Sequence, residues 1–184
     1  MFYIACTRFT DETWEENINF RNKTGEQVAY ASSVKIRNIY SKGCLLFVAE
    51  MNNKQNKIEG IGLIRNLISC DKHYRIHKNN EYNRFIYKGK YRLSRQQLID
   101  INPEIVEILD NILFKGKSNL KRFLGITILT KKLFTNWNYE LDDLSKYIKN
   151  AFLCVFIRPS NNLFLEDEQS DKTIEYESDL DLEI

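Results

Sequence analysis

The sequence predicts an α+β fold, in which a small antiparallel, barrel-like sheet is flanked by helices and followed by an acidic C-terminal tail. The clearest indication is an apolar run at residues 44–49, a polar connector and a glycine-bearing apolar run at residues 58–64, which together predict a β-hairpin. Apolar residues at helical spacing later in the chain predict the helices. Residues 160–184 hold nine acids and one base, Lys172. We therefore expect one globular domain over residues 1–159 and a disordered tail after it.

The first forty residues predict two strands and a short helix. Residues 2–8 are mainly apolar and predict an opening strand. Thr10 is expected to cap the helix, because two acids follow it in the first turn, where carboxylates suit the helix dipole. The apolar face of this helix is expected to consist of Trp14, Ile18 and Phe20. Residues 34–40 alternate apolar and basic side chains, which predicts a half-buried strand with Lys35 and Arg37 in solvent.

Two glycines stand two residues apart in the second strand of the expected hairpin. Gly60 and Gly62 would lie on the same face of that strand. Glycine at such places removes a side chain where another backbone or a ligand comes close, or marks a bulge.

The middle of the chain predicts a second hairpin and a capped helix. Residues 82–93 form two short apolar and basic runs that would turn at Lys88 and Gly89. Ser94 is then expected to cap a short helix over residues 95–99.

Two longer helices and one strand are expected after this point. Pro103 suits the first helical position and opens a helix over residues 104–114. Residues 125–130 predict a strand. Residues 138–156 carry apolar side chains at helical spacing and predict the longest helix, which the proline at position 159 would end.

The net charge of +2 hides an uneven distribution. The first 159 residues carry 26 basic and 16 acidic side chains, whereas the remainder is strongly acidic. A basic body attracts polyanions, and an acidic tail can compete for the same surface. We therefore expect nucleic acid, either RNA or single-stranded DNA, as the partner. Removing residues 160–184 should then tighten binding at low salt.

Basic and aromatic residues alternate between positions 73 and 95, where cations could meet phosphates and rings could stack on unpaired bases. The alternative is a solvated hairpin whose rings pack inward. A second basic loop, residues 115–122, is either a phosphate contact or a solvated loop, and it contains no P-loop pattern. The candidate cations are Arg84, Lys88, Lys90, Arg92, Lys115, Lys117, Lys121 and Arg122. The candidate stacking rings are Tyr82, Tyr87 and Tyr91.

One cluster has zinc-like spacing. Cys70, His73 and His77 are suitable zinc ligands, but no fourth ligand follows at motif spacing, so an ordinary polar loop is favoured and no metal is expected. The patterns of serine hydrolases, zinc proteases, zinc deaminases and dinucleotide-binding enzymes are absent from the sequence. We expect no cofactor, and the sequence favours a protein without catalytic activity.

The remaining composition bears on the cellular compartment. The four cysteines are widely spaced, and three lie in apolar runs, so we expect reduced and mostly buried thiols in an intracellular protein. The apolar run at the N-terminus is too short for a signal peptide, and no run approaches the length of a membrane span.

The order of strand, helix and glycine-flanked strands resembles the PUA-like group, which includes EVE, ASCH and YTH domains. The residues that carry this resemblance are 2–8, 43–48 and 58–64. It implies a small barrel with a pocket beside it that receives a nucleotide or a modified base. The whole chain also resembles uncharacterised proteins of large DNA viruses, notably at residues 51–53, 87–91 and 115–122. That second resemblance implies a viral factory or virion as a location, beside cytoplasm or nucleus.

These observations favour a non-catalytic nucleic-acid-binding protein with a basic and aromatic face. The alternative is a structural or assembly protein, such as a virion component, that uses the same face for protein contacts and its acidic tail for a basic neighbour. A third possibility is a nucleic-acid-modifying enzyme with an unrecognised site, in which replacing Cys70 or His73 would abolish activity.

Overall fold

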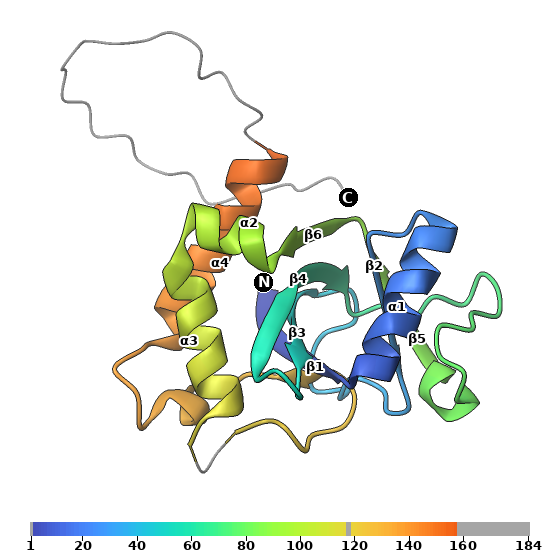
Figure 1. Ribbon diagram of the computed structural model, residues 1–184, viewed down its shortest axis with the longest axis horizontal. Coiled ribbons are helices and arrows are strands. Elements are labelled where there is room, and N and C mark those ends of the chain that lie inside the picture. The colour runs from blue at the N-terminus through green and yellow to red at the C-terminus, as the bar shows by residue number, and fades with distance from the viewer. Residues whose placement is uncertain (1, 117–118, 158–184) are drawn as a thin grey trace, which may run out of the picture.

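The computed structural model describes residues 2–116 and 119–157 (Figure 1). It is an α+β structure with helices on both sides of a sheet. Lys117 and the predicted acidic tail, residues 160–184, lie outside the described residues.

The main sheet has five strands in the order β6-β4-β3-β1-β7. Their bounds are β1 Phe2–Phe9, β3 Leu45–Asn52, β4 Lys57–Arg65, β6 Tyr91–Ser94 and β7 Thr127–Ile128. β1 and β3 are parallel, because the chain crosses over through a helix and another strand between them, whereas the other neighbours are antiparallel. The prediction of an antiparallel sheet was therefore wrong in this respect. In the described part of the chain the sheet ends at β6 and β7 and does not close into a barrel.

The predicted hairpin over residues 44–64 is confirmed as the antiparallel pair β3–β4. Its glycines lie where neighbours approach closely, as expected. A Cβ atom on Gly62 would lie 2.2 Å from the Tyr30 hydroxyl, and one on Gly60 would lie 2.5 Å from the carbonyl oxygen of Leu93. A side chain at Gly60 would collide with the backbone of β6, and one at Gly62 would collide with the Tyr30 and Val28 side chains.

The second predicted hairpin was wrong. β5 (Phe85–Gly89) pairs with β2 (Val28–Ser32) in a separate two-stranded sheet, whereas β6 pairs with β4. The chain passes between the two sheets at Gly89, where a Cβ atom would lie 1.9 Å from the carbonyl oxygen of Leu63. Glycine is therefore needed at this position for close passage between sheets instead of for a hairpin turn.

Helix α1 (Asp11–Thr24) begins where it was predicted. The Thr10 and Thr13 side chains cap each other's backbone N–H groups, which confirms the cap. Its buried face is more polar than expected, since Asn17 is fully buried and donates to the Ala29 carbonyl oxygen at 2.6 Å. Trp14 packs against Phe9.

Residues 34–40 do not form a strand, and the prediction was wrong there. Only Ile36 is buried in this loop, and its N–H donates to the Tyr87 hydroxyl at 3.1 Å. Lys35 and Arg37 are exposed, as the alternation predicted. The strand in this part of the chain is β2, which the sequence did not indicate.

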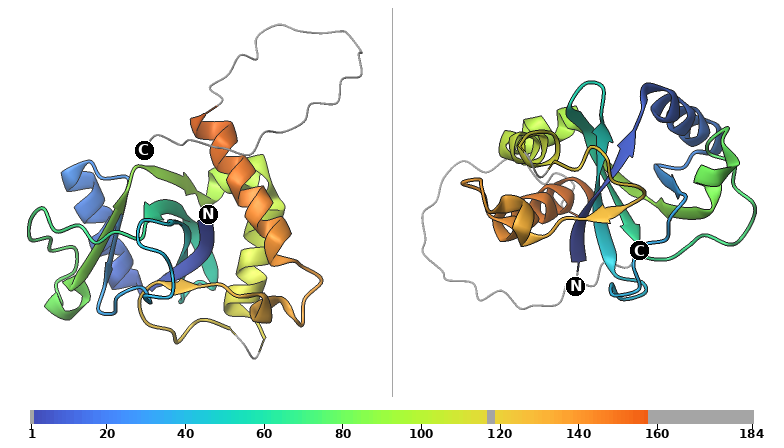
Figure 2. Two further views of the ribbon diagram at one scale, coloured as in Figure 1. Left: turned by 180° about the vertical axis from the view of Figure 1, so that it is seen from behind. Right: turned by 90° about the horizontal axis from the view of Figure 1, so that it is seen from below.

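Helices α2 (Arg95–Ile101), α3 (Pro103–Phe114) and α4 (Leu141–Phe156) lie on the side of the main sheet opposite α1 (Figures 1 and 2). The Ser94 cap and Pro103 at the first helical position are confirmed. Two short 3₁₀ helices, η1 (Asn80–Asn83) and η2 (Lys131–Phe134), interrupt the loops. The strand predicted over residues 125–130 is shorter and consists of β7 alone.

The cysteines are free thiols but are less buried than expected. Cys6 is buried, and its burial raises the pKa of the thiol to about 12. Cys44 is half-buried, whereas Cys70 and Cys154 are exposed, so the prediction of mostly buried thiols was wrong for these two. Among the helices described, none has the length and apolar character needed to cross a membrane.

Candidate nucleic-acid interface

A cavity of about 120 Å³ opens where β1 ends and α1 begins. Six parts of the chain line it: the end of β1, the first turn of α1, the end of β2, the β3–β4 turn, the segment with His77 and Tyr82 that includes η1, and the loop with Leu124 and Gly125. These parts lie far apart in the sequence, so only the fold brings them together.

One wall of the cavity is the N-terminal turn of α1, with Thr10 and Thr13. The N–H groups of a first helical turn carry partial positive charge, which favours an anion nearby. On the outer side of this turn Asp11 is paired with Lys54, whose Nζ lies 2.5 Å from the carboxylate.

Two polar groups in the cavity wall have no partner among the described residues. Thr7 is only 7% exposed and makes no side-chain hydrogen bond to another described residue, although its hydroxyl oxygen itself is not fully buried. The Oδ1 atom of Asn53 is buried and also unpaired, although its Nδ2 donates to the Lys121 carbonyl oxygen at 2.8 Å. A buried polar group without a partner costs about 1–3 kcal/mol, so native proteins rarely keep one unless water or a ligand meets it. The cavity is therefore suited to a ligand that forms hydrogen bonds.

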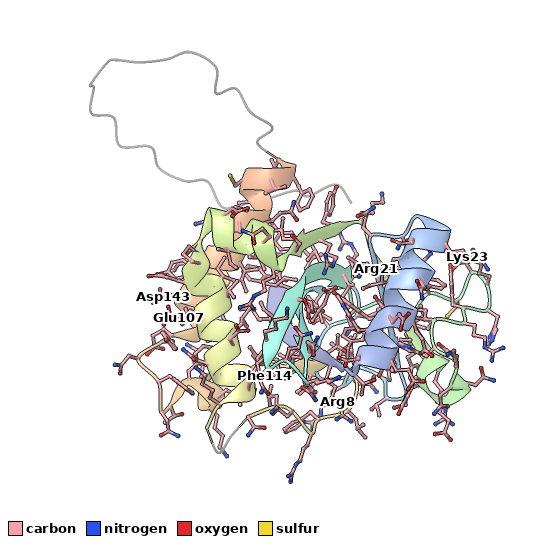
Figure 3. All side chains as sticks on the ribbon, in the orientation of Figure 1. Arg8, Arg21, Lys23, Glu107, Phe114 and Asp143 are labelled. Carbon is pink, nitrogen blue, oxygen red and sulfur yellow. The ribbon has the colours of Figure 1, made fainter. Side chains whose placement is uncertain are left out.

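The basic loop predicted from the sequence reaches the mouth of this cavity. Arg8 lines the cavity and donates to the Lys121 carbonyl oxygen at 3.1 Å, beside the bond from Asn53 to the same oxygen. Lys121 is half-buried and Arg122 is exposed. Figure 3 shows Arg8 close to the start of α1, on the outside of the molecule.

Part of the predicted basic and aromatic segment reaches the same place. Tyr82 is 41% exposed and lines the cavity, with its ring edge-to-face with His77 at 6.0 Å. Arg84 follows two residues later and is exposed. Tyr82 from this segment thus lines the cavity, and the backbone of Lys121 in the basic loop is held by Arg8 and Asn53 from the cavity wall.

Other predicted residues are engaged elsewhere. Lys88 donates to Glu26 at 2.9 Å and to the Tyr74 hydroxyl at 2.8 Å, and these hydrogen bonds raise the pKa of its ammonium group. Arg92 is bound by both oxygens of Glu50, at distances from 2.6 Å to 3.0 Å. Their charges are therefore largely neutralised by carboxylates, which disfavours a role in holding phosphates.

The predicted stacking role fails for Tyr87, which is fully buried between the two sheets and accepts a hydrogen bond from the Ile36 N–H. Tyr91 is half-buried and packs against Phe156 with ring centres 4.9 Å apart. Lys90 is exposed but lines a different depression, and Lys115 donates to Asn111 at 2.7 Å. Of the three tyrosines, Tyr82 alone is placed beside the cavity.

The zinc-like spacing does not produce a cluster of ligands in the described part of the chain. Cys70 and His73 are exposed, whereas His77 is buried with its Nδ1 3.0 Å from a Glu16 oxygen. Burial lowers the pKa of His77, and Glu16 offsets this only in part. His77 therefore acts as a neutral hydrogen-bonding group in the wall of the cavity.

A buried ionic cluster under α1 was missed by the sequence analysis. Glu50 is fully buried on β3, where it binds Arg92 and accepts from the Tyr30 hydroxyl at 2.9 Å. The Trp14 ring lies 5.3 Å from the Arg21 guanidinium and 5.8 Å from that of Arg92. Figure 3 shows Arg21 towards the end of α1. The only sequence signal for this cluster was the acidic residue Glu50 directly after the apolar run at residues 44–49.

The residues inside the cavity, Thr7 and Asn53, were also missed. Their only sequence signal is a polar residue at the end of the opening strand and an asparagine in the hairpin connector.

Searches against protein-family models, curated proteins and solved structures found nothing that matches this chain.

Proposed function

We propose that this protein binds RNA or single-stranded DNA without chemistry of its own, with the cavity at the start of α1 taking one unpaired base. The observation that carries the proposal is that Thr7, Asn53 with its unpaired buried Oδ1 atom, and the cation Arg8 line the same cavity. The volume of about 120 Å³ is well below the roughly 300–1,000 Å³ of pockets for larger ligands, which limits the occupant to a small ring system.

The lining matches the chemistry of a base. The Asn53 Oδ1 can accept from an exocyclic amine or a ring N–H, and the Thr7 hydroxyl can both donate and accept. Tyr82 offers an exposed ring at the wall, and stacking of a base on an aromatic ring contributes about 1–3 kcal/mol. The flanking phosphates would meet Arg8 and Arg122.

The resemblance to PUA-like domains is a second argument for the proposal. It rests on the strand-helix-strand order and on the paired glycine-bearing strands, and such domains hold a base beside the sheet. The mixed sheet described above departs from a closed barrel, so the proposal depends on the cavity and not on the resemblance.

The test is fluorescence anisotropy of the full-length protein with single-stranded RNA, single-stranded DNA and duplex DNA over a salt series. We expect single strands to bind best, with affinity that falls steeply as salt rises. Replacing Arg122 with Ala should lower the slope of log affinity against log salt by about 0.7, the value for one phosphate contact on a single strand. Lys90→Ala is the matched control, since it removes an exposed cation that lines another depression.

Tyr82→Ala should weaken single-strand binding by about 1–3 kcal/mol without changing that slope, because it removes stacking and no charge. Equal binding by the wild type and both site variants would contradict the proposed site. If none of the three nucleic acids binds even at low salt, the proposal fails and a role in protein assembly is favoured.

A further inference from the structure

A second hollow, a groove of about 630 Å³, runs along strand β7. The loop over residues 34–40 and the segment over residues 119–133 form its walls. β7 is the last strand on this side of the main sheet, so one of its edges has no neighbouring strand in the described part of the chain (Figure 2). An edge of this kind presents backbone N–H and C=O groups that an added strand can bind.

Three large apolar side chains lie exposed together in the groove. Val34, Phe123 and Leu124 line it and are 49%, 52% and 58% exposed. Ile126 and Ile128 from the edge strand and its approach form part of the floor. Large apolar side chains that gather at one exposed place are typical of an interaction surface.

The groove also carries positive charge without a compensating acid. Lys35, Arg37 and Lys132 line it, are exposed, and form no ion pair with any residue that the structure describes. No acidic side chain is among the described residues that line it. By contrast, Lys88 and Arg92 are each bound to a carboxylate. The groove therefore fits a partner that combines apolar and acidic side chains.

The sequence of this chain contains such a partner between positions 173 and 184. Even positions there are mainly apolar: Ile174, Tyr176, Leu180, Leu182 and Ile184. Odd positions after Thr173 are all acidic: Glu175, Glu177, Asp179, Asp181 and Glu183. A period of two places one set on each face of an extended chain, which gives one apolar face and one acidic face.

We propose that residues 173–184 bind in this groove as an added strand beside β7. Their apolar side chains would cover Val34, Phe123 and Leu124, and their carboxylates would meet the three cations at the rim. This inference does not depend on nucleic-acid binding. Leu124 lines both the groove and the cavity, so the two hollows are neighbours.

The length of chain before this segment is sufficient for it to bind its own body. Fifteen residues separate Ile157 from Thr173. An extended chain of that length spans roughly 50 Å, whereas a folded body of this size has a radius of gyration of about 15 Å. Such a connection gives the segment an effective concentration in the millimolar range. If the segment binds the groove with a Kd of about 0.1 mM, the bound form should exceed the unbound form roughly tenfold.

The test is hydrogen exchange of the full-length chain followed by mass spectrometry. Peptides that cover residues 34–40 and 123–133 should exchange about tenfold more slowly in the wild type than in a variant with Leu180→Ser and Leu182→Ser. Peptides from α3 should be unchanged. The matched control is Glu166→Gln with Glu168→Gln, which alters acids outside the proposed segment and should keep the protection.

Charge-reversal variants test whether the acidic side chains of the segment pair with the cations at the rim of the groove. Lys35→Glu with Arg37→Glu should remove the protection, and adding Glu175→Lys with Glu177→Lys should restore it. Lys23→Glu with Lys78→Glu, two exposed cations outside the groove, is the control and should have no effect. Equal exchange of the groove peptides in the wild type and the serine variant would overturn the proposal. Protection that increases with protein concentration would also overturn it, in favour of the segment of a second copy.

Discussion

The two faces of the main sheet differ in what they bury. The face towards α3 and α4 is apolar, with Phe47 and Met51 of β3 packed against Leu109 and Phe152. The face towards α1 contains Thr7 and Glu50 together with the guanidinium of Arg92, and α1 itself buries Asn17. The cavity and its unpaired polar groups lie on this second face. The face towards α3 and α4 therefore provides most of the hydrophobic stabilisation, whereas the face towards α1 holds the buried polar and charged side chains.

The strongest test of this difference is Arg92→Leu. It leaves Glu50 as an uncompensated buried charge, so we expect the free energy of unfolding to fall by about 3–5 kcal/mol. Urea denaturation measures this change. The double variant with Glu50→Leu should recover much of the loss, because it removes the stranded charge as well. A single variant as stable as the wild type would contradict the cost of leaving Glu50 without its partner.

Leu109→Ala tests the apolar face. Leu109 is fully buried on α3, so the cavity left by its side chain should cost about 2–5 kcal/mol. In native conditions the folded fraction should bind single-stranded nucleic acid as the wild type does, because no residue of the site changes. Reduced affinity at full folding would contradict the separation of the two faces.

Thr7→Val separates stability from binding at a single position. The two side chains have similar shapes, and the Thr7 hydroxyl has no partner among the described residues, so stability should stay the same or rise slightly. Binding of a single strand should weaken by about 0.5–1.5 kcal/mol if the hydroxyl bonds a base. Thermal unfolding and anisotropy titration measure the two effects. A loss of stability without a loss of affinity would place the hydroxyl in the structure and not in the site.

The smallest effect concerns pH and His77. Its pKa is lowered in the folded protein by burial, so the unfolded chain binds more protons as the pH falls below about 6.5. Its contribution to stability is therefore fully present above that pH and decreases towards the lowered pKa. His77→Gln should flatten the fall in stability between neutral and mildly acidic pH, as measured by denaturation at several pH values. An unchanged pH profile would contradict the shift.

The sequence predicted those parts of the fold that depend on local signals. The Thr10 and Ser94 caps, Pro103 at a helix start and the hairpin around Gly60 all follow from neighbouring residues. The parallel pairing of β1 and β3 was not predictable in this way. The passage of the chain between sheets at Gly89 was misread, because the glycine is required by Leu63, a residue 26 positions away.

The site was predictable only in part for the same reason. The carboxylates that bind Lys88 and Arg92 lie 62 and 42 positions away in the chain, so the sequence could not show that these cations are engaged. Tyr82 and Lys121 were among the candidates because aromatic rings can stack on bases and cations can bind phosphates. Thr7 and Asn53 were missed, since their importance comes from lacking partners in the folded state.

The basic loop is anchored by an atom that every residue type has. Arg8 and Asn53 both bind the backbone carbonyl oxygen of Lys121 and not its side chain. Substitutions at position 121 can therefore change the charge of the basic loop while the loop keeps its attachment. In evolutionary terms, the side chain at this position is free to change without loss of the two hydrogen bonds that hold the loop.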